Sequence, residues 1–142
     1  MKQNVLIIEE NKAIRFLLNT TLQRAYKTFD TSDVYDGLNI LNKHTIDLII
    51  LSVDAADTIQ YEFISHLKSS SILSHIPVLI VTNSLDPIFL QNLFENGVHQ
   101  VFPKPFDPIL ILNEITRIVE EKEQQKSSTM NKIYESNNIK TA

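Results

Sequence analysis

The chain has 142 residues, the length of a single domain with one hydrophobic core and a short tail. Its 43% hydrophobic and 21% charged residues are typical of a globular protein, and its net charge of -4 argues against nucleic-acid binding. Cysteine is absent, which excludes disulfides, thiol catalysis and zinc–thiolate sites. Without a signal peptide or an apolar run near ~20 residues, the sequence predicts a cytoplasmic protein with no membrane attachment.

The first part of the chain alternates apolar runs with helical patterns. Residues 5–8 form a continuous apolar run, as expected for a strand buried on both faces. Asn11 is suited to cap a helix whose core-facing residues recur at spacings of three and four: Ile14, Leu17, Leu18, Thr21, Leu22 and Ala25. A weaker strand is predicted at 28–31. Asp36-Gly37 is expected to form a turn that leads into a short helix.

The central part repeats this alternation. Residues 48–53 are a second fully buried strand, and a third helix is marked by Phe63, Ile64 and Leu67. Residues 78–81 then form another buried strand, which Thr82 closes.

In the last part of the chain, proline and glycine mark the ends of the helices more clearly. Asp86-Pro87 predicts a helix start, with Asp as the N-cap and Pro in the first turn, and Gly97 predicts its left-handed C-cap. A short strand at 101–102 precedes a second cap-and-proline start, Asp107-Pro108, which opens a helix carrying Ile109, Leu112, Ile115, Ile118 and Val119. Five strands alternating with five helices predict a doubly wound parallel α/β sheet, whose function lies beyond the carboxyl ends of the strands.

The sequence predicts a domain at 1–120 followed by a polar segment at 121–142. This segment begins with Glu-Lys-Glu-Gln-Gln-Lys and carries only isolated apolar residues, so no second core can form there. Two readings stay open: a disordered tail, or an ordered extension of the last helix that serves as a dimer-forming arm.

From Lys2 to about Val119 the chain resembles the receiver domain of two-component response regulators, the CheY-like family. The resemblance lies in the order of four features: an acidic pair after the first strand, a site residue ending the third, a threonine ending the fourth and a Lys-Pro-Phe turn after the fifth. In this sequence they are Glu9-Glu10, Ser52, Thr82 and Lys104-Pro105-Phe106. The resemblance implies a flavodoxin-like sheet with strand order 2-1-3-4-5.

Receivers of this family hold magnesium with the acidic pair and an aspartate, and that aspartate accepts a phosphoryl group from a histidine kinase. Here Glu9 and Glu10 match the acidic pair with one extra methylene each, and Ser52 stands at the acceptor position. A serine hydroxyl is a poor nucleophile without a neighbouring base, and it removes one negative charge from the metal site. We therefore expect no catalytic residue, no enzyme activity and no cofactor, with at most weak magnesium binding at Glu9 and Glu10.

Two routes to phosphorylation stay open. Glu9 or Glu10 could act as a base for Ser52, or Asp54 could replace the missing acceptor or ligate a metal. Asp54 lies two residues beyond Ser52, so a continuing strand would point both side chains to the same pocket.

The resemblance also covers the residues that respond to phosphorylation in this family. Thr82 keeps the hydroxyl that senses the phosphoryl oxygen, but the aromatic switch position is Val101, which has no large side chain to bury. Lys104 is expected to pair with Glu9 or Glu10, and the resemblance implies a cis peptide before Pro105.

Without phosphorylation, the surface is expected to carry the function. The family signals through the face formed by the fourth helix, fifth strand and fifth helix, where this chain carries Phe89, Phe94, Phe102 and Ile109. Phe89 and Ile109 are predicted to be exposed, while Leu90, Leu93 and Phe94 pack on the sheet. This face predicts a protein partner, such as a histidine kinase, or a homodimer.

The preferred hypothesis is a stand-alone pseudo-receiver in two-component phosphorelay signalling that acts through protein contacts. The first alternative is a phosphoacceptor receiver that uses Asp54 and a weakened magnesium site. The second is a receiver-like fold used as a small-ligand or anion sensor at Glu9, Ser52 and Lys104.

Overall fold

A computed structural model describes the backbone of residues 3–141 and the side chains of residues 3–135. The elements alternate in the order β1 (Asn4–Ile8), α1 (Lys12–Leu22), β2 (Lys27–Thr31), α2 (Val34–Lys43), β3 (Leu48–Ser52), α3 (Thr58–Ser69), β4 (Val78–Thr82), α4 (Pro87–Glu95), β5 (Gln100–Pro103) and α5 (Pro108–Thr141). All neighbouring strands pair in parallel, in the order β2-β1-β3-β4-β5. The predicted fold class and strand order are confirmed.

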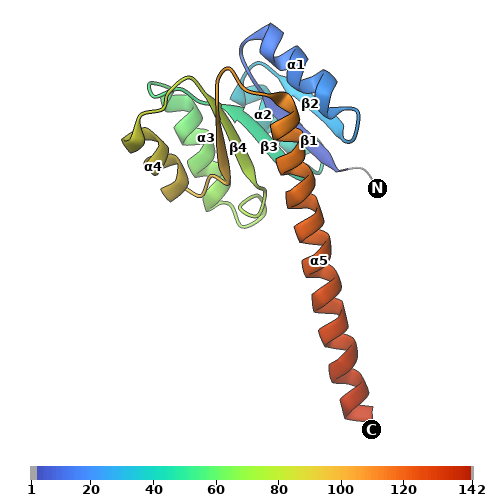
Figure 1. Ribbon diagram of the computed structural model, residues 1–142. Helices are drawn as coiled ribbons and strands as arrows, with labels where there is room; N and C mark the ends of the chain where they lie inside the picture. Colours follow the sequence, from blue (N-terminus) through green and yellow to red (C-terminus); the bar gives the residue numbers. More distant parts are fainter. Residues whose placement is uncertain (1–2, 142) are drawn as a thin grey trace.

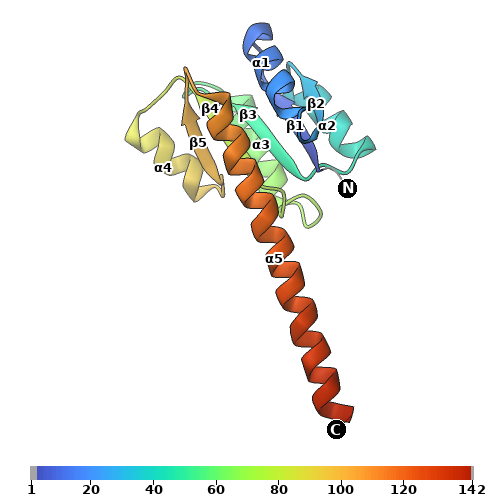
Figure 2. The same cartoon turned by 45° about the vertical axis from the view of Figure 1, so that its right-hand side comes forward.

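The sheet lies between two helical layers, as Figures 1 and 2 show. Because strand side chains alternate between faces, Leu6, Ile49 and Ile80 pack with residues of α2, α3 and α4. Their neighbours Val5, Ile50 and Val81 pack on the opposite face, with residues of α1 and α5. Burial on both faces explains why the central strands are continuous apolar runs rather than alternating ones.

Predicted capping residues begin three of the helices. Asn11 Oδ1 accepts the Ile14 N–H at 3.0 Å, and Asp86 Oδ2 accepts the Phe89 N–H at 3.2 Å. Asp107 Oδ1 likewise accepts the Ile109 N–H at 2.9 Å at the start of α5. These bonds satisfy amide groups that the first helical turn leaves without partners. Gly97 ends α4 with a φ of 89°, as predicted.

The start of α2 differs from the prediction. The helix begins before the predicted turn at Asp36-Gly37, and Asp33 caps it, since Asp33 Oδ1 accepts the Asp36 N–H at 2.8 Å. Gly37 therefore lies inside the helix and is not a turn residue. A Cβ atom at this position would come within 2.6 Å of Ile8 Cδ1, so this glycine lets α2 approach β1 closely.

The orientation of α4 also corrects a prediction. Phe89 is only 4% exposed and its ring stacks edge-on against Tyr61, with ring centroids 6.1 Å apart. Phe94 is 46% exposed instead of packed on the sheet. The helix turns Phe89 and Leu93, four residues apart, toward the core, which places Phe94 on the flank. Ile109 is exposed, as predicted.

Helix α5 continues without a break past the predicted boundary at residue 120. Figures 1 and 2 show it leaving the body of the domain and extending beyond the sheet. Ile115 and Ile118 are buried against the sheet, whereas Met130, Ile133 and Tyr134 are exposed. The described residues of this segment therefore form an ordered extension of α5 and not a disordered tail. The domain boundary at residue 120 and the role of the extension as a dimer arm stay predictions. Residues 3–141 contain no helix whose length and apolarity would let it cross a membrane.

Candidate functional site

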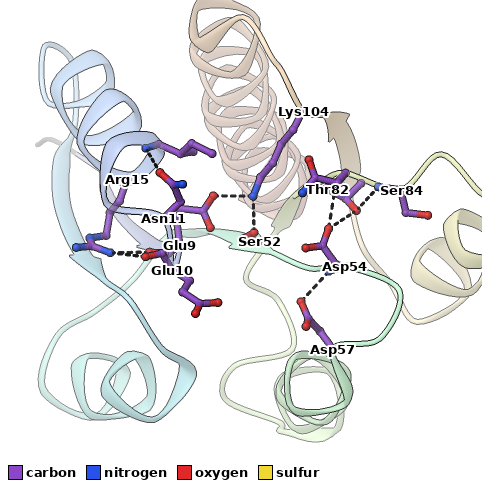
Figure 3. Close-up of polar contacts among 12 residues, drawn as sticks. Glu9, Glu10, Asn11, Arg15, Ser52, Asp54, Asp57, Thr82, Ser84 and Lys104 are labelled. Carbon is purple, nitrogen blue, oxygen red and sulfur yellow. Dashed lines mark hydrogen bonds and ion pairs between the residues drawn. The ribbon is translucent and has the colours of Figure 1, made fainter.

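A cavity of about 650 Å³ lies at the carboxyl edge of the sheet, where the loops after β1, β3 and β5 meet. Its polar lining includes Glu9, Glu10, Ser52, Asp54, Asp57 and Lys104. Figure 3 shows these side chains around the ends of the strands. Parallel strands end at the same edge, so residues that are distant in sequence meet here, as predicted.

Lys104 is the central cation of the cavity. Its Nζ lies 2.7 Å from Glu9 Oε1 and donates a hydrogen bond to Ser52 Oγ at 2.9 Å. The Glu9 side chain is 2% exposed and that of Lys104 is 11% exposed. Among the described residues, Glu9 Oε1 has no hydrogen-bonding partner beyond this ion pair. The predicted pairing of Lys104 with an acidic residue is confirmed, and Glu9 is that residue.

The two members of the acidic pair have different environments. Glu9 is buried, whereas Glu10 is exposed at the rim of the cavity. Arg15 Nη1 donates to the backbone oxygen of Glu9 at 2.8 Å and its Nε forms an ion pair with Asp30 at 3.4 Å. Sequence reasoning missed Arg15, although its position in the first turn of α1, just after the acidic pair, was a usable signal.

Asp54 lines the same cavity but is hydrogen-bonded on the side of β4. Its Oδ1 accepts the Asn83 N–H at 3.1 Å and faces the Thr82 hydroxyl at 3.4 Å. Its own N–H donates to Asp57 Oδ2 at 2.8 Å. The sequence did not single out Asn83 or Asp57, because a backbone donor and a loop carboxylate leave no pattern in a sequence.

The three acidic side chains expected near a magnesium ion, Glu9, Glu10 and Asp54, each have a different environment. A magnesium site needs oxygen ligands that converge at about 2.0–2.1 Å in near-octahedral geometry. Here the Lys104 ammonium lies against Glu9, Glu10 is exposed and Asp54 is bonded to the end of β4. Across the described residues, no three acidic or histidine side chains gather as a metal-binding group.

The remaining predicted site residues lie on or next to β4 and β5. Thr82 is fully buried, and Val101 is half-buried against the core beside α4. Phe102 is half-buried against the core on the other face of the sheet. The peptide between Lys104 and Pro105 is cis, as the resemblance implied.

An ion network joins His99, the residue before β5, to α5 near the predicted partner face. The Arg117 guanidinium forms an ion pair with Glu114, and His99 Nε2 lies 3.3 Å from Glu114 Oε1. Hydrogen bonding from Arg117 lowers the pKa of the Glu114 carboxyl below its ordinary 4.5, although partial burial opposes the shift. This group therefore stabilises the fold above its unfolded pKa and loses that contribution as pH falls through its folded pKa.

Substitution of Arg117 is expected to flatten this acid dependence. Below pH 4.5, the free energy of unfolding of Arg117→Ala should fall less steeply than that of the parent, because the Glu114 pKa moves back toward its unfolded value. Urea unfolding at a series of pH values measures this slope, with the exposed Arg24→Ala as a control that keeps the parent's slope. Parallel curves for the parent and Arg117→Ala would contradict the linkage.

Comparison with known proteins places the chain among signalling proteins. It is 30% identical over 108 residues to sporulation initiation phosphotransferase F of Bacillus subtilis, covering 75% of this chain and 86% of that protein. It is 27% identical over 120 residues to the phosphate regulon transcriptional regulatory protein PhoB of Escherichia coli, covering 84% of this chain and 52% of PhoB. A histidine kinase P4 of Formosa agariphila is 25% identical over 130 residues, or 92% of this chain and 10% of the kinase. The chain therefore spans about half of the regulator and a tenth of the kinase.

Solved structures share its fold. The chemotaxis response regulator CheY4 of Vibrio cholerae matches with a TM-score of 0.74 and 25% identity, over 83% of this chain and 99% of CheY4. A CheY-like receiver domain protein from Methanospirillum hungatei gives a TM-score of 0.77 at 17% identity, over 88% of this chain and 99% of that protein. The family model of the response regulator receiver domain matches residues 5–116. The chain belongs to the response regulator receiver domain family of two-component signalling.

Proposed function

We propose that this chain is a receiver in a cytoplasmic two-component pathway that is not phosphorylated, is not an enzyme and signals through protein contacts. The observation that carries the proposal is the position of Lys104, whose ammonium is bound between Glu9 and Ser52. At the centre of the cavity, Ser52 and Glu9 are therefore both bound to Lys104, and among the described residues no nucleophile lies free beside a metal site.

The chemistry of Ser52 supports this proposal. Its Oγ accepts a hydrogen bond from a cation, and an ammonium group cannot take the proton that a serine must lose to attack phosphorus. Glu9, the buried carboxylate nearby, is held by Lys104 and forms no described hydrogen bond with the hydroxyl. Neither Lys104 nor Glu9 is therefore in a position to act as the base for Ser52.

The two alternative functions receive less support from the contacts. For Asp54 to act as a phosphoacceptor, its carboxylate would have to leave Asn83 and Thr82, with no metal ligands converging around it. For the cavity to sense an anion, it would need a free cation. Lys104 is instead paired with Glu9, and Glu10 and Asp54 add negative charge.

We infer that protein partners bind the face formed by α4, β5 and α5. Several large apolar side chains are exposed there: Ile88 at 70%, Phe94 at 46%, Ile109 at 43% and Leu110 at 56%. Exposed apolar side chains of this kind favour protein contacts over a free surface. A histidine kinase of the pathway and a second copy of the chain are the proposed partners, and nucleic acid is not.

Phosphorylation chemistry tests the proposal directly. The protein is incubated with magnesium and either acetyl phosphate or beryllofluoride, and its mass and amide NMR spectrum are recorded. We expect an unchanged mass and no magnesium-dependent shifts around Ser52 and Asp54. CheY4 of Vibrio cholerae, a chemotaxis response regulator of the same fold, provides the parallel sample. A phosphoryl adduct on this chain would overturn the proposal.

A further inference from the structure

A run of hydrogen bonds links the start of α3 to the end of β4, as Figure 3 shows in part. Asp57 Oδ2 accepts the Asp54 N–H at 2.8 Å, which fixes the backbone of the loop after β3. Asp54 Oδ1 in turn accepts the Asn83 N–H at 3.1 Å and lies 3.4 Å from the Thr82 hydroxyl oxygen. One carboxylate oxygen thus faces two donors of the neighbouring loop.

The same run continues into the first turn of α4. Thr82 Oγ1 accepts the Ser84 N–H at 3.1 Å, and Ser84 Oγ accepts the Asp86 N–H at 3.3 Å. Asp86 Oδ2 then caps the helix by accepting the Phe89 N–H at 3.2 Å. Because the Phe89 ring is buried against Tyr61 of α3, the run ends on a residue that anchors α4 to the core.

We propose that the Asp54 carboxylate is a latch that holds the loop after β4, and with it the start of α4, in one arrangement. The backbone pairing of β3 and β4 ends with the bond from Val53 N to Val81 O at 3.1 Å. Past that bond, among the described residues, hydrogen bonds join the two loops only through Asp54 Oδ1. Removal of this single oxygen therefore disconnects the loops while the sheet stays intact.

The charge of Asp54 determines the strength of the latch. Hydrogen bonds to an ionised acceptor are roughly twice as strong as neutral ones. The one lysine of the cavity is paired with Glu9, so the Thr82 and Asn83 donors are the groups that compensate the Asp54 charge. The latch stays closed with no group attached to Ser52. This inference rests on the proposed function and deepens it, because the latch would hold the α4 side of the partner face in a single state.

Amide hydrogen exchange and NMR of the full chain test the latch. In Asp54→Ala, the Asn83 amide is expected to exchange about tenfold faster than in the parent, because its acceptor is gone. Chemical shifts should also change along α4 as far as Phe94. Asp54→Asn keeps a neutral acceptor and should give an intermediate exchange rate. The matched control is Glu10→Ala, which removes an exposed carboxylate from the same cavity and should leave the Asn83 amide unchanged.

A second variant keeps the test decisive if Asp54→Ala does not fold. Thr82→Val has nearly the same shape but lacks the hydroxyl that faces Asp54 and accepts the Ser84 N–H. It should speed exchange at Ser84 and shift α4 in the same direction. In Asp54→Ala, an Asn83 exchange rate within about twofold of the parent, with chemical shift changes confined to the loop after β3, would overturn the latch. A phosphoryl adduct would instead overturn the proposed function and leave these exchange results standing.

Discussion

Replacement of Lys104 by methionine is expected to lower the free energy of unfolding by about 3 kcal/mol. Removal of one partner of a buried ion pair typically costs ~3–5 kcal/mol, because the other charge stays buried without compensation. Glu9 fits this case, since its side chain is 2% exposed and Lys104 lies 2.7 Å away. Total stabilities of ~5–15 kcal/mol make this a large fraction of the fold's stability. Urea unfolding at neutral pH measures the loss.

Two further variants separate the ion pair from a general effect of losing a lysine. Lys43→Met removes an exposed lysine at the end of α2 and should change stability by less than about 0.5 kcal/mol. The double variant Glu9→Met with Lys104→Met replaces both charges with apolar groups, and should recover most of the loss. A Lys104→Met variant as stable as the parent would show that Glu9 does not depend on this ammonium.

The triple variant Glu9→Asp, Glu10→Asp, Ser52→Asp is expected to bind magnesium and to gain a phosphoryl group from acetyl phosphate. The carboxylate introduced at position 52 would supply an ionised oxygen that attacks phosphorus and releases acetate, and it would give Lys104 a new partner. The two shorter carboxylates would leave room for a metal ion where Glu9 now meets the ammonium. Magnesium titration followed by amide NMR and intact mass measures both gains.

Controls for this variant come from the same cavity. The double variant that keeps Ser52 should take up no phosphoryl group, because it lacks the acceptor oxygen. Adding Asp54→Ala to the triple variant should increase the yield of adduct, since the Thr82 hydroxyl and Asn83 amide would then be free to face a phosphoryl group. If magnesium causes no shifts in the triple variant, the cavity differs from an active receiver in more than these three side chains.

Local patterns in the sequence were enough to predict most of the fold. Continuous apolar runs predicted the buried strands, because a sheet covered on both faces has no polar side. The caps Asn11 and Asp86 predicted helix starts, since their side chains satisfy free amides within three residues. The start of α2 was predicted too late, because Asp36-Gly37 has the composition of a turn, yet Asp33 caps the helix and both residues lie inside it.

The orientation of α4 could not be read from spacing alone. Phe89 with Leu93 and Leu90 with Phe94 are both pairs four residues apart, so two neighbouring stripes satisfy the same helical period. The contact of Phe89 with Tyr61 of α3 decides between them, and it comes from a part of the chain distant in sequence. Phe94 therefore takes the place of Phe89 among the exposed side chains of the proposed partner face.

The sequence by itself determined the alternation of strands and helices and the residue types that meet at the carboxyl edge of the sheet. Through the family resemblance it also led to the prediction that Ser52 stands at the acceptor position. Only the tertiary structure decided that Lys104 binds Glu9 and not Glu10, and that Asp54 turns toward Asn83. The physical reason is that strands and helices follow from local periodicity, whereas the partner of a buried charge depends on distances set by the packing of separate loops.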